Sequence, residues 1–180
     1  MHSCLVGSEM CIRDRPRDKH LSDFDFKRIP DLSLSVVNRL AEGDFMDRAE
    51  NILIFGNPGT GKTHLAIALT REWCLTGRKV KFYQAYELVQ DLIVAKKKYE
   101  MSNMIKRLNQ YDVLIIDDIS YVPFDRKETD VLFNLMSSRY ENKSMLITSN
   151  TSFSNWESIF KDKMTTCLLY TSDAADDIRR

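Results

Sequence analysis

The sequence lacks the features that identify membrane-spanning and secreted proteins. No apolar run among its 180 residues approaches the roughly 20 that a bilayer-spanning helix needs. Residues 1–15 lack the continuous apolar stretch of a signal peptide. No internal repeat or low-complexity linker interrupts the chain. We therefore expect a cytoplasmic protein that has no membrane partner.

A charge bias is also missing. Lysine plus arginine and aspartate plus glutamate number 26 each, so the formal net charge is +0 at pH 7. Such a chain exerts no global attraction on nucleic acid or anionic lipid, although a local basic patch still can. The hydrophobic fraction of 43% is ordinary for a globular protein. The length suffices for one domain with its own core.

The two ends read as foreign sequence. One coding of residues 10–15 (MCIRDR), ATG TGT ATA AGA GAC AGR, carries TGT CTC TTA TAC ACA on its opposite strand, which encodes residues 167–171 (CLLYT). Both ends also resemble translated transposase adapters from sequencing libraries; a natural inverted repeat is the alternative. We expect residues 1–15 and 167–180 to be adapter-derived, 16–50 to be a lead-in, and 51–166 to be an incomplete core. Only Cys74 then remains, so neither a disulfide framework nor a metal cluster is predicted.

Short apolar runs alternate with helical patterns along the core. Strands are predicted at 51–55, 80–83, 113–116 and 145–148. Helices are predicted before Gly43, at 62–75, 86–95 and 104–108, and after Asp125, where Glu128 completes a capping box. This alternation predicts an α/β fold in which helices cover both faces of a parallel sheet.

A phosphate-binding loop follows the first predicted strand. Gly56, Asn57, Pro58, Gly59, Thr60, Gly61, Lys62 and Thr63 match G-x-x-x-x-G-K-[ST] in full. Glycines let the backbone N–H groups turn inward around a polyphosphate, and the following helix points its positive end at the same phosphates. Lys62 can reach the outer phosphates, Thr63 can offer its hydroxyl to Mg²⁺, and the backbone N–H of His64 can face the α-phosphate. The loop predicts ATP as the ligand.

Polar residues end the third and fourth predicted strands. Asp117 can hold Mg²⁺ through water, and Asp118 can orient an attacking water. Asp118 is one methylene shorter than the glutamate that is commoner in this position. The amide of Asn150 could hydrogen-bond the γ-phosphate or the attacking water, and an ordinary strand-end asparagine is the equal alternative.

Several strings across the core resemble the AAA+ ATPases of the IstB/DnaC group. They are residues 21–26 (LSDFDF), 49–56 (AENILIFG), 59–66 (GTGKTHLA), 112–118 (DVLIIDD), 139–141 (RYE), 147–150 (ITSN) and 153–156 (FSNW). Residues 121–125 (YVPFD) and the Ser-Asn-x-x-Phe-Ser-x-Trp pattern are closer to IstB than to the helicase loaders. The resemblance implies a P-loop NTPase of AAA+ type, with three αβα layers, in which Asn150 is the sensor-1 residue.

The resemblance also implies partners and a departure from the family. IstB-like proteins are ATPases that assist a DNA transposase, which implies DNA, a transposase and self-association as partners. A DnaC-like adaptor that binds a replicative helicase, and an unrelated P-loop kinase, are the alternatives. Relatives carry an arginine finger, a last strand and a helical lid beyond Trp156, where this chain has Cys167 onward. We therefore expect this chain to hydrolyse ATP weakly or not at all, and we interpret Arg139 as a surface arginine rather than the finger.

One basic stretch stands out from the balanced background. Lys96, Lys97 and Lys98 are consecutive, and Lys106 and Arg107 follow in the next predicted helix. These cations could contact DNA phosphates, and a solvated helix face is the alternative.

Overall fold

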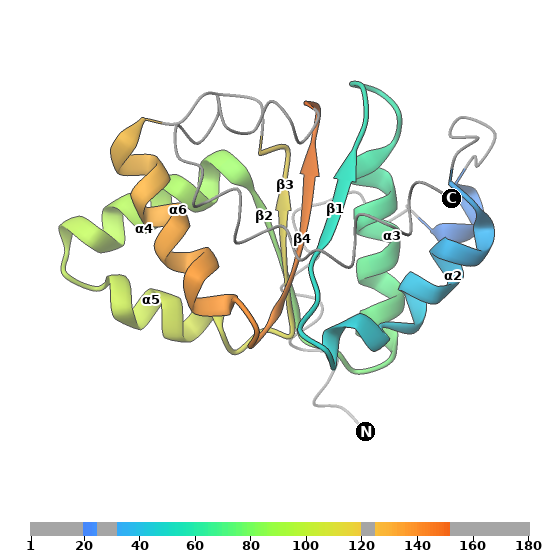
Figure 1. The fold of residues 1–180 in the computed structure, drawn as a ribbon, viewed down its shortest axis with the longest axis horizontal. Coiled ribbons are helices and arrows are strands. Elements are labelled where there is room, and N and C mark those ends of the chain that lie inside the picture. Colours follow the sequence, from blue (N-terminus) through green and yellow to red (C-terminus); the bar gives the residue numbers. More distant parts are fainter. Residues whose placement is uncertain (1–19, 25–31, 120–124, 152–180) are drawn as a thin grey trace.

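The computed structural model describes residues 20–24, 32–119 and 125–151 (Figure 1). The predictions for both ends, and for residues 121–124 and 153–156, fall outside these ranges. The elements in chain order are η1 (Leu21–Asp23), α2 (Leu34–Glu42), η3 (Asp44–Met46), β1 (Ile52–Phe55), α3 (Lys62–Leu75), β2 (Val80–Gln84), α4 (Ala85–Lys97), α5 (Met101–Leu108), β3 (Val113–Asp117), α6 (Arg126–Arg139) and β4 (Ser144–Ser149). Every predicted strand and helix is found, within a few residues of its expected bounds.

The strands form one parallel four-stranded sheet in the order β1-β4-β3-β2. Helices α2 and α3 cover one face, and α4, α5 and α6 cover the other (Figure 1). This is the predicted α/β fold with three αβα layers. Because the strands are parallel, all their carboxyl ends lie at one edge of the sheet. The carboxyl ends of β1, β4 and β3 are therefore neighbours.

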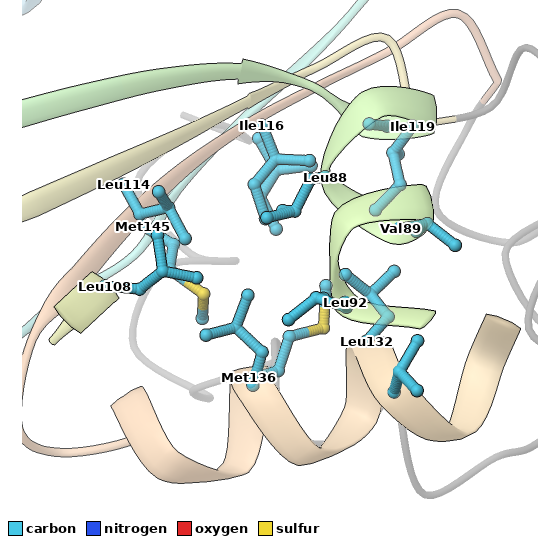
Figure 2. Close-up of a cluster of buried hydrophobic side chains, with 14 of the residues drawn as sticks. Leu88, Val89, Leu92, Leu108, Leu114, Ile116, Ile119, Leu132, Met136 and Met145 are labelled. Atoms are coloured by element: carbon cyan, nitrogen blue, oxygen red, sulfur yellow. The ribbon is translucent and has the colours of Figure 1, made fainter. Parts of the chain in front are cut away.

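Each central strand contributes to a core on both faces of the sheet. Leu114 and Ile116 of β3 pack with Met145 of β4 against α4 and α6, as Figure 2 shows. The intervening residue Ile115 faces the other way and joins the cluster around α3, which includes Trp73. Burial on both faces explains why these strands read as continuous apolar runs rather than alternating ones.

Local signals in the sequence set the helix ends. At the start of α6, Asp125 Oδ1 accepts the Glu128 N–H at 2.8 Å, and Glu128 Oε2 accepts the Asp125 N–H at 2.8 Å, which confirms the capping box. Gly43 ends α2 in the left-handed conformation at φ 83°. Within the described ranges, no helix combines the length and apolarity needed to cross a membrane.

Arg139 does not lie on the surface, so that interpretation is wrong. Its side chain is fully buried at 0% exposure. Its Nη1 donates a hydrogen bond to Leu108 O at 2.9 Å. Its Nη2 donates to Tyr111 O at 3.1 Å and to Ser144 O at 2.7 Å. Burial lowers the pKa of Arg139 to about 10, so the guanidinium stays charged at neutral pH. The cation supplies charged donors to carbonyls at the end of α5, in the loop after it and at the start of β4.

We predict that Arg139→Ala lowers the free energy of unfolding by about 3 kcal/mol, because several buried carbonyls lose their donor. Urea unfolding followed by circular dichroism measures the change. Arg126→Ala removes an exposed arginine from the same helix and should stay within about 0.5 kcal/mol of the parent. Equal stability of the two variants would contradict the anchoring role.

Candidate nucleotide-binding site

The loop between β1 and α3 is held in place from two directions. Gly56 N–H donates to Ser149 O of β4 at 3.2 Å, which ties the start of the loop to the neighbouring strand. Gly61 has φ +95°, and a Cβ atom there would lie 3.2 Å from Cε2 of Phe24. A side chain at Gly61 would therefore combine a disfavoured backbone with a steric conflict. The loop needs glycine at this position, as the motif predicts.

Lys62 folds back inside the loop. Its Nζ donates to Gly56 O at 2.7 Å and to Asn57 O at 2.9 Å, and only 8% of the residue is exposed. Burial lowers the pKa of Lys62, and the nearby Asp118 and Asp117 carboxylates oppose that shift. Within the described part of the chain, the hydrogen-bond acceptors of the ammonium are two neutral carbonyls. Phosphate oxygens would be stronger, charged acceptors for the same group.

Thr63 and Asp117 bring two kinds of oxygen together across the sheet. Thr63 Oγ1 lies 3.0 Å from each carboxylate oxygen of Asp117. Oxygen ligands of this kind suit Mg²⁺, which usually keeps several waters and binds through one or two protein groups plus phosphates. The part of the chain that the structure describes holds no cluster of three or more His, Cys, Asp and Glu side chains that could bind a metal without such help. The pair fits a magnesium ion that shares its shell with a nucleotide.

Asp118 adopts a backbone conformation that is uncommon for a side-chain-bearing residue. Its φ is 60°, and its Oδ1 accepts Asn150 Nδ2 at 2.5 Å. Burial raises the pKa of Asp118, the neighbouring Asp117 carboxylate raises it further, and Lys62 lowers it. The structure therefore places Asn150 against the second carboxylate of the strand end, within the same site.

Sequence reasoning missed Thr148. This buried residue of β4 donates its hydroxyl to Asp117 Oδ1 at 2.7 Å and accepts the Asp118 N–H at 2.8 Å. The signal that could have found it is the period of a strand. Thr148 precedes Asn150 by two residues, so both side chains point the same way.

These residues surround one open pocket of about 430 Å³. Its lining consists of Pro58, Gly59, Gly61, Lys62, Thr63, His64, Asp118, Thr148 and Asn150. The remaining predicted residues, Gly56, Asn57, Thr60 and Asp117, are not among the lining residues. The volume falls in the range of small-molecule and cofactor sites.

His64 and Phe24 form an aromatic contact beside the phosphate loop. Their ring centroids lie 5.4 Å apart at 89°, an edge-on arrangement. His64 Nε2 is buried, and the described residues offer it no hydrogen-bond partner. The ring packs against the lead-in segment.

The fold and the site define a P-loop ATP-binding protein of the AAA+ type. The family model for the IstB-like ATP binding protein matches residues 6–171. The chain belongs to this family, as the sequence resemblance indicates.

Relatives from insertion sequences support the same assignment. An insertion-sequence ATP-binding protein of Sinorhizobium fredii is 41% identical over 148 residues, which cover 82% of this chain and 50% of the relative. An IS21 ATP-binding protein of Pseudomonas aeruginosa is 39% identical over 147 residues, which cover 82% of this chain and 56% of the relative. The chain thus spans about half the length of these curated relatives.

Solved structures share the fold at low sequence identity. The DnaC helicase loader matches with a TM-score of 0.68 and 21% identity, covering 76% of this chain and 82% of that one. AMPPCP-bound DnaA from Aquifex aeolicus matches with a TM-score of 0.72 and 21% identity, covering 85% of this chain and 48% of that one.

We predict that Asp118→Asn raises the melting temperature at neutral pH. The folded-state pKa lies above the ordinary value of 3.8, so the ionised carboxylate destabilises the folded chain at higher pH. Stability that the protonated form provides is lost as pH rises through the folded pKa. The gain from Asn should therefore shrink as the pH is lowered and vanish below the ordinary value. Thermal unfolding between pH 7 and about pH 3 measures this difference.

The control for that comparison is Asp130→Asn. Asp130 is an exposed aspartate on α6, so its substitution changes net charge by the same amount without relieving burial. An equal gain from Asp130→Asn would mean that net charge, rather than the site, causes the effect. A loss of stability for Asp118→Asn at neutral pH would contradict the prediction outright.

Proposed function

We propose that the chain is the ATP-binding core of an IstB-type protein that assists a DNA transposase and couples ATP binding and hydrolysis to assembly on DNA, and that this chain by itself hydrolyses ATP weakly or not at all. The observation that supports this most directly is the contact of Thr63 Oγ1 with both oxygens of Asp117 at 3.0 Å. It joins the phosphate loop to the carboxylate strand end, in the same site as Lys62, Asp118 and Asn150. An isolated glycine-rich turn would have no such partner.

Each side chain of the site would have its own role in the transfer of the γ-phosphoryl group to water. Lys62 would leave its two carbonyl acceptors and bind the outer phosphates, and the N–H groups of the loop would bind the oxygens around them. Thr63 and Asp117 would hold Mg²⁺, which neutralises charge on the β- and γ-phosphates when it is bound. Asp118 would accept a hydrogen bond from the attacking water, and its raised pKa makes it a better base near neutral pH. Asn150 would contact the γ-phosphate or that water.

The choice of partner rests on the relatives. Their names place them in insertion sequences, which supports a transposase and its DNA as partners. The likeness to the DnaC helicase loader, at 21% identity, concerns the fold alone. A pull-down of a full-length relative against its transposase and a replicative helicase distinguishes the proposal from the helicase-loader alternative.

We predict that Lys62→Ala abolishes stabilisation by Mg-ATP. A ligand at about 100 times its Kd stabilises a protein by about 2.7 kcal/mol, which a thermal melt detects readily. The variant loses the buried cation that faces the phosphates. Lys127→Ala removes an exposed lysine from α6 and should keep the full shift. Equal stabilisation of the parent and Lys62→Ala would refute nucleotide binding at this loop.

The end of α4 is the candidate contact for DNA. Lys96, Lys97 and Lys98 are all exposed, and Tyr99 beside them is 97% exposed at φ 59°. Three adjacent cations can displace counterions from phosphates, and an exposed aromatic ring adds a flat contact surface. Lys96 and Lys97 also complement the helix dipole, which is a purely structural reason for their position.

We predict that changing Lys96, Lys97 and Lys98 to glutamine weakens DNA binding of this chain and of a full-length relative with the equivalent change. The slope of log affinity against log salt should flatten by up to about three phosphate contacts. Fluorescence anisotropy across a salt series gives both quantities. The control changes the exposed Lys79, Arg126 and Lys127 to glutamine and removes the same net charge elsewhere. Equal effects of the two triple variants would favour the solvated-face alternative.

A further inference from the structure

Among the described residues, the hydroxyl of Thr148 makes two hydrogen bonds, one to each of the two acidic residues of the site. Its Oγ1 lies 2.7 Å from Asp117 Oδ1 and 2.8 Å from the backbone nitrogen of Asp118. The backbone N–H can only donate, so the Thr148 oxygen accepts that bond and its own hydrogen is donated to the Asp117 carboxylate. The direction of both bonds is fixed by chemistry rather than by choice of hydrogen position. The residue is 1% exposed, so its hydroxyl is shielded from bulk water.

Asp117 receives hydroxyl groups from both sides of the sheet edge. Thr63 approaches from the start of α3, and Thr148 approaches from β4. Under the proposed function, Thr63 is the hydroxyl that binds the magnesium ion. Once Thr63 binds the ion, the hydrogen bond from Thr148 is the one that still fixes the rotamer of the Asp117 carboxylate, which holds the same ion.

The same hydroxyl of Thr148 also helps to hold Asp118 in its orientation. The residue sits at φ 60°, in a region that few non-glycine residues adopt. Thr148 holds its N–H at 2.8 Å, while Asn150 holds its carboxylate at 2.5 Å. Asp118 is therefore held at two points, by Thr148 of β4 and by Asn150, the residue that follows β4. A threonine that served packing alone would have no reason to bond both acidic residues of the site.

We propose that Thr148 is a positioning residue of the magnesium-nucleotide site, whose single hydroxyl orients the Asp117 carboxylate for Mg²⁺ and holds the Asp118 backbone in place. This inference rests on the proposed function. It differs from a general contribution to stability because it predicts an effect that depends on the metal. Outer-shell partners of metal ligands typically change metal affinity by 10- to 100-fold when removed.

The test uses Thr148→Val, which keeps the branched shape and lacks the hydroxyl, and Thr148→Ser, which keeps the hydroxyl. Binding of a fluorescent, non-hydrolysable ATP analogue to this chain is titrated with Mg²⁺, and its affinity is also measured in EDTA. We expect Thr148→Val to raise the Mg²⁺ concentration at half-maximal effect by about tenfold, with affinity in EDTA unchanged. Thr148→Ser should restore the parent value.

A matched control is Thr70→Val. Thr70 is also a buried threonine, at 3% exposure, but its hydroxyl donates to Ala66 O of its own helix at 2.7 Å. Its removal should lower stability without moving the Mg²⁺ midpoint. If Thr148→Val does not fold, Thr148→Ala removes the same hydroxyl without adding a methyl group, and the same shift is expected.

Three results would overturn the proposal. An unchanged Mg²⁺ midpoint in the hydroxyl-free variant would reduce Thr148 to a structural residue. An equal loss of affinity with and without Mg²⁺ would place its role in the nucleotide pocket rather than at Asp117. Failure of the parent chain to bind the analogue, or unimpaired binding by Lys62→Ala, would overturn the proposed function itself, and the inference with it.

Discussion

The position of β4 between β1 and β3 is the constraint on which the site depends. Parallel pairing on both sides brings the carboxyl ends of the three strands together at one edge. The phosphate loop leaves β1 there, and Asp117 ends β3 there. Thr63, at the start of α3, thus contacts Asp117 at the end of β3, although β4 lies between β1 and β3 in the sheet. An order that placed further strands between β1 and β3 would separate the loop from that carboxylate.

This arrangement places charged side chains close together and partly out of water, which costs free energy in the folded chain. Lys62 is buried against carbonyl oxygens, and Asp118 is partly buried beside a second carboxylate in a left-handed backbone conformation. A bound nucleotide and its metal would supply the charges that these groups lack. Such local strain is found where a site is shaped for its ligand rather than for its own stability. The two-sided core of the sheet supplies the rigidity that holds it.

Arg139 shows how the scaffold uses a charge away from the site. Its guanidinium lies in the interior and bonds carbonyls of Leu108, Tyr111 and Ser144, which come from three separate segments. This joins the end of α5 to the start of β4, whose other end holds Thr148 and leads into Asn150. An arginine at the end of an amphipathic helix is usually exposed, so its residue type gives no sign of this role.

The sequence alone determined the elements and most of the site. Short apolar runs identified the four strands, and the full P-loop pattern identified Lys62 and Thr63, because both signals are local in the chain. Only the tertiary structure decided the strand order and the burial of Arg139. It also decided which side chains meet in the site: Thr63 with Asp117, and Thr148 and Asn150 with Asp118. Each of these joins residues that are distant in the chain, and local periodicity carries no information about which distant strand lies alongside. Thr148 in particular looks like any β-branched residue of a buried strand until β3 is placed beside it.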